Sequence, residues 1–347
     1  MECREDLLRA GLVKESIGLA IGYTVTYLCV GLSLSALKSD LDANIADAIH
    51  YGCPYNVQQK MMVLDQTIVN LIDDVEHPTV LSGEIMDQDD ELHKVAGLGA
   101  LRIRLGMDAC RLMLCCVFGD WITAETLIDD LEQFGDERDP FLMRSHFRHC
   151  YVGLAAFALS RAEKDAKLRK KYLAIGKKML KCFTKEMKCG SVNAFPIVQM
   201  LEAEQSPSKE RYDNAIKATA RLGLVHHEAY MCERAAEMFL AQGDDEWCKH
   251  YISEAITLYG EWGATGKVNR LTNDYEDVLQ GSTLMPSQNK SMQSRSRYSG
   301  RELDSLRIVD WKSFHNSVDK DLDFSYRTSV VGGSGALSSR GSFSSAI

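Results

Sequence analysis

The chain has 347 residues, 45% of them hydrophobic, which is enough to bury the core of one large domain or two ordinary ones. Its formal net charge of −9 and its sequence pI of about 5.5 argue against a nucleic-acid-binding protein, because binding to phosphates needs a surface with an excess of lysine and arginine. The sequence has only six prolines and no sustained alternation of apolar and polar residues, so we predict an all-α fold.

The eleven cysteines do not follow a pattern typical of disulfides or zinc sites. No two of them form a CxxC motif, and the N-terminus does not resemble a secretory signal. Most lie in apolar stretches, as Cys115 and Cys116 do. Small buried thiols in a reducing compartment account for this usage, so we predict a cytoplasmic protein whose cysteines bind no metal.

The first long apolar stretch, residues 16–37, contains no charged side chain and has the length of a membrane-spanning helix. Gly31 and the serine at position 33 predict instead that one helix ends and the next begins inside this stretch. The second helix would run to Tyr51 and end at Gly52. The favoured interpretation is a hairpin of buried helices, and the alternative is a membrane anchor at 16–37.

Two further features are predicted before residue 92. A helix over 54–75 should end before His77-Pro78, because the residue that precedes a proline avoids the α conformation. The acidic stretch 85–92 is predicted to be a solvated loop. It lacks the spacing and the central glycine of an EF-hand, so we predict no calcium site there.

Three segments of the middle of the chain are predicted to be helical. The strongly apolar stretch 92–118 and residues 121–135 form two helices joined by a turn at Gly119-Asp120. The basic run from Lys164 to Lys188 is interpreted as the solvated face of a third helix.

Another helix is predicted to start at Asp139-Pro140, and it carries His146, His149 and Cys150 within about one turn. Side chains of these types can bind a metal ion. No fourth ligand is indicated, so we interpret them as ordinary residues of the helix.

A short pattern recurs along the chain: an isoleucine stands seven residues before a glycine, and a large apolar residue stands just before that glycine. In each copy the glycine would end a helix in the left-handed conformation. The glycines are 83, 88 and 40 residues apart, which fits a repeating unit of about 40–44 residues. Because one hairpin cannot bury its apolar face alone, we predict a TPR-like α-solenoid of stacked hairpins over residues 1–280. The copies are Ile45/Gly52, Ile128/Gly135, Ile216/Gly223 and Ile256/Gly263.

Three segments match catalytic motifs incompletely. Residues 97–102 lack the third glycine of a dinucleotide-binding loop. Gly263–Val268 contains Gly-Lys, but its first glycine is too close and a valine replaces the magnesium-binding Ser or Thr. His227-Glu228 lacks the second histidine of a zinc protease, because Met231 occupies that position. We therefore predict no catalytic, cofactor-binding or metal-binding residue, and no cofactor.

The composition changes after Gln280, since 17 of the last 67 residues are serine. This composition predicts a disordered tail over 281–347. Within the tail, apolar residues at 301–319, Trp311 among them, are spaced as in an amphipathic helix that could dock on the solenoid or on a partner.

Residues 192–279 resemble a known kind of helical region. The segments that carry the resemblance are LEAEQ (201–205), YDNAI (212–216), HHEAYMCERAAEMFLAQGD (226–244) and YISEAITLYGEWGATGKVNRL (251–271). They are similar to the TPR-like helical region of multidomain signalling kinases and predicted STAND-type AAA ATPases. In that family the nucleotide-binding and kinase residues belong to other domains, which this chain lacks. The resemblance implies packing and turn roles for Glu233, Ala236, Phe239, Tyr259, Trp262, Gly263, Lys267 and Val268.

These observations predict a non-catalytic helical-repeat module for protein–protein interaction or conformational relay in signal transduction, either the C-terminal part or a derivative of a signalling ATPase or kinase. Its partner is expected to be a protein of unknown identity, with no nucleic acid. One alternative is a membrane-anchored adaptor that uses 16–37 as a single transmembrane helix. A weaker alternative is an enzyme with an unrecognised site among His146, His149 and Cys150.

Overall fold

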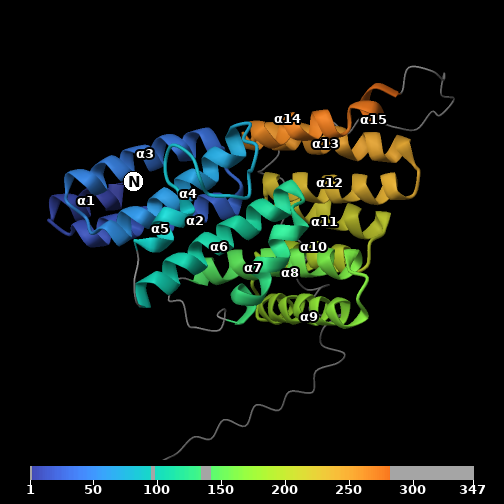
Figure 1. The fold of residues 1–347 in the computed structure, drawn as a ribbon, viewed down its shortest axis with the longest axis horizontal. Coiled ribbons are helices and arrows are strands. Elements are labelled where there is room, and N and C mark those ends of the chain that lie inside the picture. The colour runs from blue at the N-terminus through green and yellow to red at the C-terminus, as the bar shows by residue number, and fades with distance from the viewer. Residues whose placement is uncertain (1, 95–97, 134–141, 282–347) are drawn as a thin grey trace, which may run out of the picture. The chain divides into compact units, whose positions relative to one another are not determined.

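The computed structural model describes residues 2–94, 98–133 and 142–281, and these residues form fifteen helices and no strand (Figure 1). Residues 282–347, which hold nearly all of the predicted tail with its helix at 301–319 and Trp311, lie outside the described residues. The helices are α1 (Glu2–Arg9), α2 (Val13–Val30), α3 (Leu34–His50), α4 (Tyr55–Ile72), α5 (Gln88–His93), α6 (Leu98–Phe118), α7 (Trp121–Gln133), α8 (Leu142–Ala162), α9 (Ala166–Lys188), α10 (Ala194–Gln205), α11 (Lys209–Arg221), α12 (Val225–Ala241), α13 (Asp245–Trp262), α14 (Thr265–Asp274) and α15 (Glu276–Gln280).

Helices that follow one another in the chain pack side by side as hairpins, which confirms the predicted all-α class. Glycines with positive φ stand between them, as the recurring pattern predicts for Gly52, Gly223 and Gly263, whereas Gly135 lies outside the described residues. Further glycines of this kind give a spacing of about 20 residues at both ends of the described chain, at Gly11, Gly31 and Gly52 and at Gly223, Gly243 and Gly263, but not between Gly52 and Gly223. Each interval holds one helix and one tight turn, so two of them make a hairpin of about 40 residues.

The uncharged stretch 16–37 is two helices and not one. α2 ends at Val30, Gly31 adopts the left-handed conformation with φ +68°, and α3 begins at Leu34 and ends at His50. Side chains on one face of α2, Ile17 and Leu28 among them, are buried in the core. In the part of the chain that the structure describes, no helix combines the length and the apolarity needed to cross a membrane.

The acidic stretch 85–92 is not the solvated loop that its composition predicts. The carboxylate of Asp87 accepts hydrogen bonds from the backbone N–H groups of Asp89 and Asp90, so it caps the short helix α5. Glu91 is buried, and its carboxylate accepts hydrogen bonds from Tyr55 and from Gln59 on α4, both at 2.7 Å. The acidic residues therefore start a helix and fasten it to α4.

Helices far apart in sequence also touch. α2 packs against α8, and α14 packs against α4. At the second of these contacts, the Thr265 hydroxyl donates a hydrogen bond to the backbone carbonyl of Ile72. Gly266 lies so close to the end of α4 that a Cβ atom there would overlap the carbonyl oxygen of Asp73. Such contacts are absent from a repeat array in which each unit meets only its neighbours.

The α4–α14 contact predicts opposite effects for two glycine substitutions. Gly266→Ala should destabilise the protein by about 1–3 kcal/mol, because the added methyl group meets rigid backbone. Gly260→Ala should instead stabilise it by roughly 0.5–1 kcal/mol, since Gly260 is an exposed helical residue with no atom near its missing Cβ. Urea unfolding of both variants measures the difference. A stabilised Gly266→Ala variant would show that α14 does not dock on α4.

Candidate functional site

The three residues of the conceivable metal site point to different surroundings. The Nε2 atom of His146 contacts the carboxylate of Glu186 on α9, and its ring lies 5.5 Å from that of Phe183. Cys150 is buried in the core, and His149 lines a small pocket. Among the described residues, no group of three or more His, Cys, Asp or Glu side chains is arranged to hold a metal ion.

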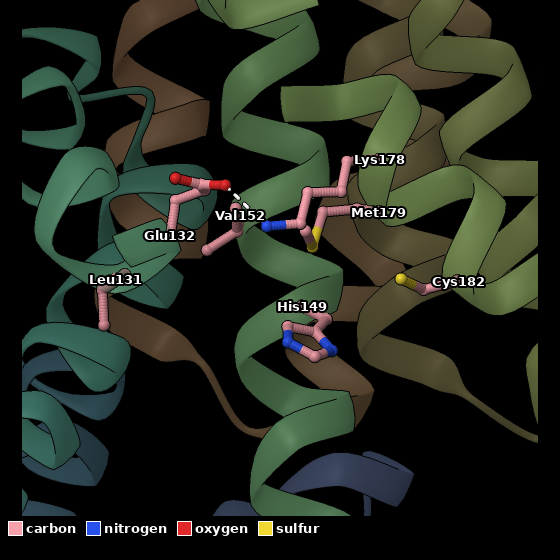
Figure 2. A pocket seen from close by; sticks show the side chains of 7 residues that line it. All are labelled: Leu131, Glu132, His149, Val152, Lys178, Met179 and Cys182. Atoms are coloured by element: carbon pink, nitrogen blue, oxygen red, sulfur yellow. Dashed lines mark hydrogen bonds and ion pairs between the residues drawn. The ribbon is translucent and has the colours of Figure 1, made fainter. Parts of the chain in front are cut away.

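The pocket beside His149 lies between α7, α8 and α9 (Figure 2). Its volume is about 20 Å³, which is room for a single water molecule. Glu132 and Lys178 form an ion pair at 2.7 Å across one side of it, and His149 and Cys182 come from the separate helices α8 and α9. The pocket is far smaller than the clefts that bind small-molecule substrates. Its lining residues are Leu131, Glu132, His149, Val152, Lys178, Met179 and Cys182.

The segment that partly matches a phosphate-binding loop forms a packed corner. Gly263 ends α13 with φ +94°, and Lys267 on α14 is buried with 3% of its surface exposed. The Lys267 ammonium lies 2.6 Å from one carboxylate oxygen of Glu233, and the hydroxyl of Tyr259 donates a hydrogen bond of 2.9 Å to the other. The rings of Phe118 and Tyr259 lie within 6 Å of the same ammonium. Lys267 therefore joins α14 to α12.

A second buried ionic group was not expected from the sequence. Glu204 on α10 is fully buried, and its carboxylate contacts the guanidinium groups of Arg161 on α8 and Arg234 on α12. Tyr212 on α11 donates a hydrogen bond of 3.1 Å to the same carboxylate. The Arg234 guanidinium also contacts Glu237 and lies over the ring of Trp121 on α7 at 5.3 Å. Five helices thus meet at one carboxylate and one guanidinium. No local signal marks Glu204 in the sequence, because Glu202 and Gln205 stand beside it in the same helix.

The charge of Glu204 is fixed by its two arginines. Burial alone would raise the pKa of the Glu204 carboxyl, but the positive charges of Arg234 and Arg161 outweigh burial and hold that pKa below its usual value. Burial raises the pKa of Glu237, which lies near Glu233 and Glu204, and Arg234 only partly offsets this rise. The ion pairs of the fully buried Glu204 carboxylate hold α8, α10 and α12 in register.

Two adjacent histidines, His226 and His227, lie in the core where α12 starts. Their rings stack 3.9 Å apart, and the ring of His226 also lies 5.3 Å from that of Trp262. Gly31, between α2 and α3, lies against His226 so closely that a Cβ atom there would overlap the imidazole. Burial lowers the pKa of His227 to about 4, and burial together with His227 lowers the pKa of His226 well below its usual value.

These histidines predict a loss of stability at mildly acidic pH. The unfolded chain protonates His227 below about pH 6.5, whereas the folded protein takes up that proton only near pH 4, so stability from this group falls as the pH drops through this window. At pH 5 the difference between the folded and unfolded pKa of His227 lowers the free energy of unfolding by about 2 kcal/mol. We expect His227→Phe to lose less stability between pH 7 and pH 5 than the parent, as measured by urea unfolding at both pH values.

The neighbouring Glu228 provides the control for this prediction. Burial, with Glu261 and Glu254 nearby, raises the pKa of Glu228 to about 7. Its folded form therefore binds a proton more readily than its unfolded form, and stability from this group rises as the pH falls from 7 to 4.5. Glu228→Gln should therefore lose more stability than the parent between pH 7 and pH 5, whereas His227→Phe should lose less. If the free energy of unfolding of the parent, of His227→Phe and of Glu228→Gln depends on pH in the same way, then His227 and Glu228 do not cause the pH dependence.

Most residues to which the resemblance assigns packing and turn roles are buried or end a helix. Ala236, Phe239, Tyr259 and Trp262 are buried, and Gly263 forms a left-handed helix end. The partial zinc-protease match is also part of the core, since His227 and Met231 are both buried. The partial dinucleotide-loop match at 97–102 begins at Gly97, which lies outside the described residues, and its other residues belong to the start of α6.

Comparison of the chain with models of known protein families, with curated proteins and with solved structures gave no match. The resemblance of residues 192–279 to the helical region of signalling kinases and ATPases therefore stays a prediction.

Proposed function

We propose that the chain is a non-catalytic helical-repeat module that binds protein partners in signal transduction, with hairpins that are the units of a TPR-like α-solenoid in which α14 additionally contacts α4. The observation that carries the proposal is the position of the ion pairs that the buried carboxylates of Glu233 and Glu204 form. Lys267 with Glu233, and Arg161 and Arg234 with Glu204, join helices of different hairpins. Stacked hairpins of this kind offer an extended surface of helix faces to a partner.

The same ion pairs suit a conformational relay. A buried pair holds its two helices in one register, because separating the charges inside the core costs several kcal/mol. A partner that shifts one helix would therefore move the helix paired with it. The resemblance to signalling ATPases and kinases supports this role, since a relay would connect a nucleotide-binding domain with an output domain.

Size-exclusion chromatography of an extract of the source cells tests whether the chain binds protein partners. We expect the chain to elute together with other proteins, well above its own mass of 38.8 kDa. Cross-linking before fractionation should give specific products that disappear when the hairpins are unfolded by mild urea. Elution as a monomer under all conditions would contradict the proposal.

Turnover of ATP tests the non-catalytic part. The purified chain with magnesium should release no phosphate above the rate of a heat-unfolded control. Hydrolysis of many equivalents of ATP that persists through successive purification steps would overturn the proposal. In that event the double variant Glu233→Leu/Lys267→Met would show whether Lys267 takes part, because this variant removes both charges and leaves no buried charge unpaired.

A further inference from the structure

Helix α9 has a charge opposite to that of the rest of the chain. It contains nine lysine and arginine residues and one acidic residue, Glu186, within a chain whose formal net charge is −9. Its apolar side chains, Tyr172, Met179 and Phe183 among them, are buried, and the helix packs against α8 and α10. In Figure 1 α9 is the lowest of the helices and lies beneath α8 and α10.

The basic residues of α9 fall into two groups. Lys171 and Lys178 form ion pairs with Asp129 and Glu132 of α7, at 2.5 and 2.7 Å. The others are exposed, and no carboxylate in the described part of the chain lies within ion-pairing distance of them. We call these residues the outer basic face: Lys167, Arg169, Lys170, Lys177, Lys181, Lys185 and Lys188.

Most charges of the outer basic face do not stabilise the helix that carries them. Lys177, Lys181 and Lys185 follow one another at intervals of four residues, and like charges at this spacing repel on a helix surface. Lys167 and Arg169 lie in the first turn and Lys170 just after it, where the helix dipole disfavours positive charge, whereas Lys185 and Lys188 lie in the last turn, where the dipole favours it. The fold therefore gains little from most of these charges, which points to a role in binding something outside the fold.

We propose that the outer basic face of α9 is the docking surface for an aspartate- and glutamate-rich segment of a protein partner. This inference rests on the proposed function and specifies the chemistry of the partner. The face from Lys167 to Lys188 is about 32 Å long at 1.5 Å per residue, which matches roughly ten residues of extended peptide. Negative side chains spaced along such a segment would neutralise the lysines and relieve their mutual repulsion.

The composition of the face favours an acidic protein segment over a membrane or a nucleic acid. No large hydrophobic residue of α9 is exposed, whereas helices that bind membrane surfaces bury Trp, Phe or Leu in the lipid. The face also lacks exposed aromatic rings on which bases could stack. Six of its seven charges are lysines, and arginine is the residue that recognises phosphate in a bidentate manner.

The test uses the full chain and a fluorescein-labelled ten-residue peptide of alternating glutamate and serine, with binding followed by fluorescence anisotropy at low and moderate salt. The variant Lys177→Gln/Lys181→Gln removes two charges from the outer basic face. The control Lys171→Gln/Lys178→Gln removes the same number of charges from the same helix, at the residues paired with α7. The first variant should bind the peptide about tenfold more weakly than the parent, and the control less than about threefold more weakly.

Three further measurements decide between outcomes. Phosphatidylserine-containing vesicles and a ten-nucleotide RNA should bind more weakly than the peptide; tighter binding of either through Lys177 and Lys181 would overturn the proposal. Equal weakening of peptide binding by both variants would also overturn the proposal, because binding would then depend only on net charge.

The melting temperature of the Lys177→Gln/Lys181→Gln variant should not fall, since the variant removes a like-charge pair. Failure of all peptide binding would reject this surface but would leave co-elution with other partners, and hence the proposed function, untouched.

Discussion

Replacing Trp262 with alanine is expected to lower the free energy of unfolding by about 3–5 kcal/mol. The side chain has 1% of its surface exposed at the end of α13. Its ring lies 5.3 Å from that of His226 and 6.5 Å from that of Tyr259, so truncation would leave a cavity between α12 and α13. Urea unfolding of the variant beside the parent measures the loss.

The control for Trp262 is Ile122, an apolar residue near the start of α7 that is 84% exposed. Ile122→Ala should change stability by less than about 0.5 kcal/mol, because an exposed side chain has little packing to lose. Equal unfolding midpoints for the parent and Trp262→Ala would show that the last hairpins are packed differently.

The buried pair of Lys267 and Glu233 predicts strongly non-additive variants. Glu233→Leu leaves the Lys267 ammonium, which is 3% exposed, without its carboxylate, and should cost about 3–5 kcal/mol. Lys267→Met leaves the Glu233 carboxylate in the core and should cost a similar amount. The double variant Glu233→Leu/Lys267→Met should recover most of this loss, since it replaces both charges by apolar groups of similar size.

A double-mutant cycle from urea unfolding of the four proteins measures the coupling between these two residues. We expect a coupling energy of several kcal/mol, larger than that of a surface ion pair. The hydroxyl of Tyr259 also loses its acceptor in both Glu233 variants, so Tyr259→Phe in the double variant should cost little. Additive losses would mean that the pair is solvated and not part of the core.

Local signals were sufficient to predict much of the helical architecture. The break at Gly31 and the helix ends at Gly52, Gly223 and Gly263 could be predicted because a left-handed residue at a helix end favours glycine. These features depend on a few neighbouring residues, and sequence patterns report such neighbours well. The position just before a glycine at a helix end did not by itself predict burial, because Trp262 is buried whereas Tyr51 and Leu222 at the corresponding positions are exposed.

Features that depend on distant residues could not be predicted in this way. The sequence around Glu204 does not show that Arg161 and Arg234 approach it from two other helices. The acidic stretch 85–92 was misread because composition alone does not show that Tyr55 and Gln59 enclose Glu91. The α4–α14 contact joins Thr265 to Ile72, and a repeat pattern in sequence predicts contacts between neighbouring units only.

The contact between α4 and α14 has a consequence for folding during synthesis. Thr265 follows Ile72 by 193 residues, so at ribosomal speeds of about 5–20 residues per second it is made roughly 10–40 s later. Throughout that interval the nascent α2–α4 segment exposes the surface that α12–α14 will cover, including the backbone beside Gly31 and Asp73. The first helices to leave the ribosome are thus among the last to complete their packing, and until then their uncovered apolar surface is open to aggregation.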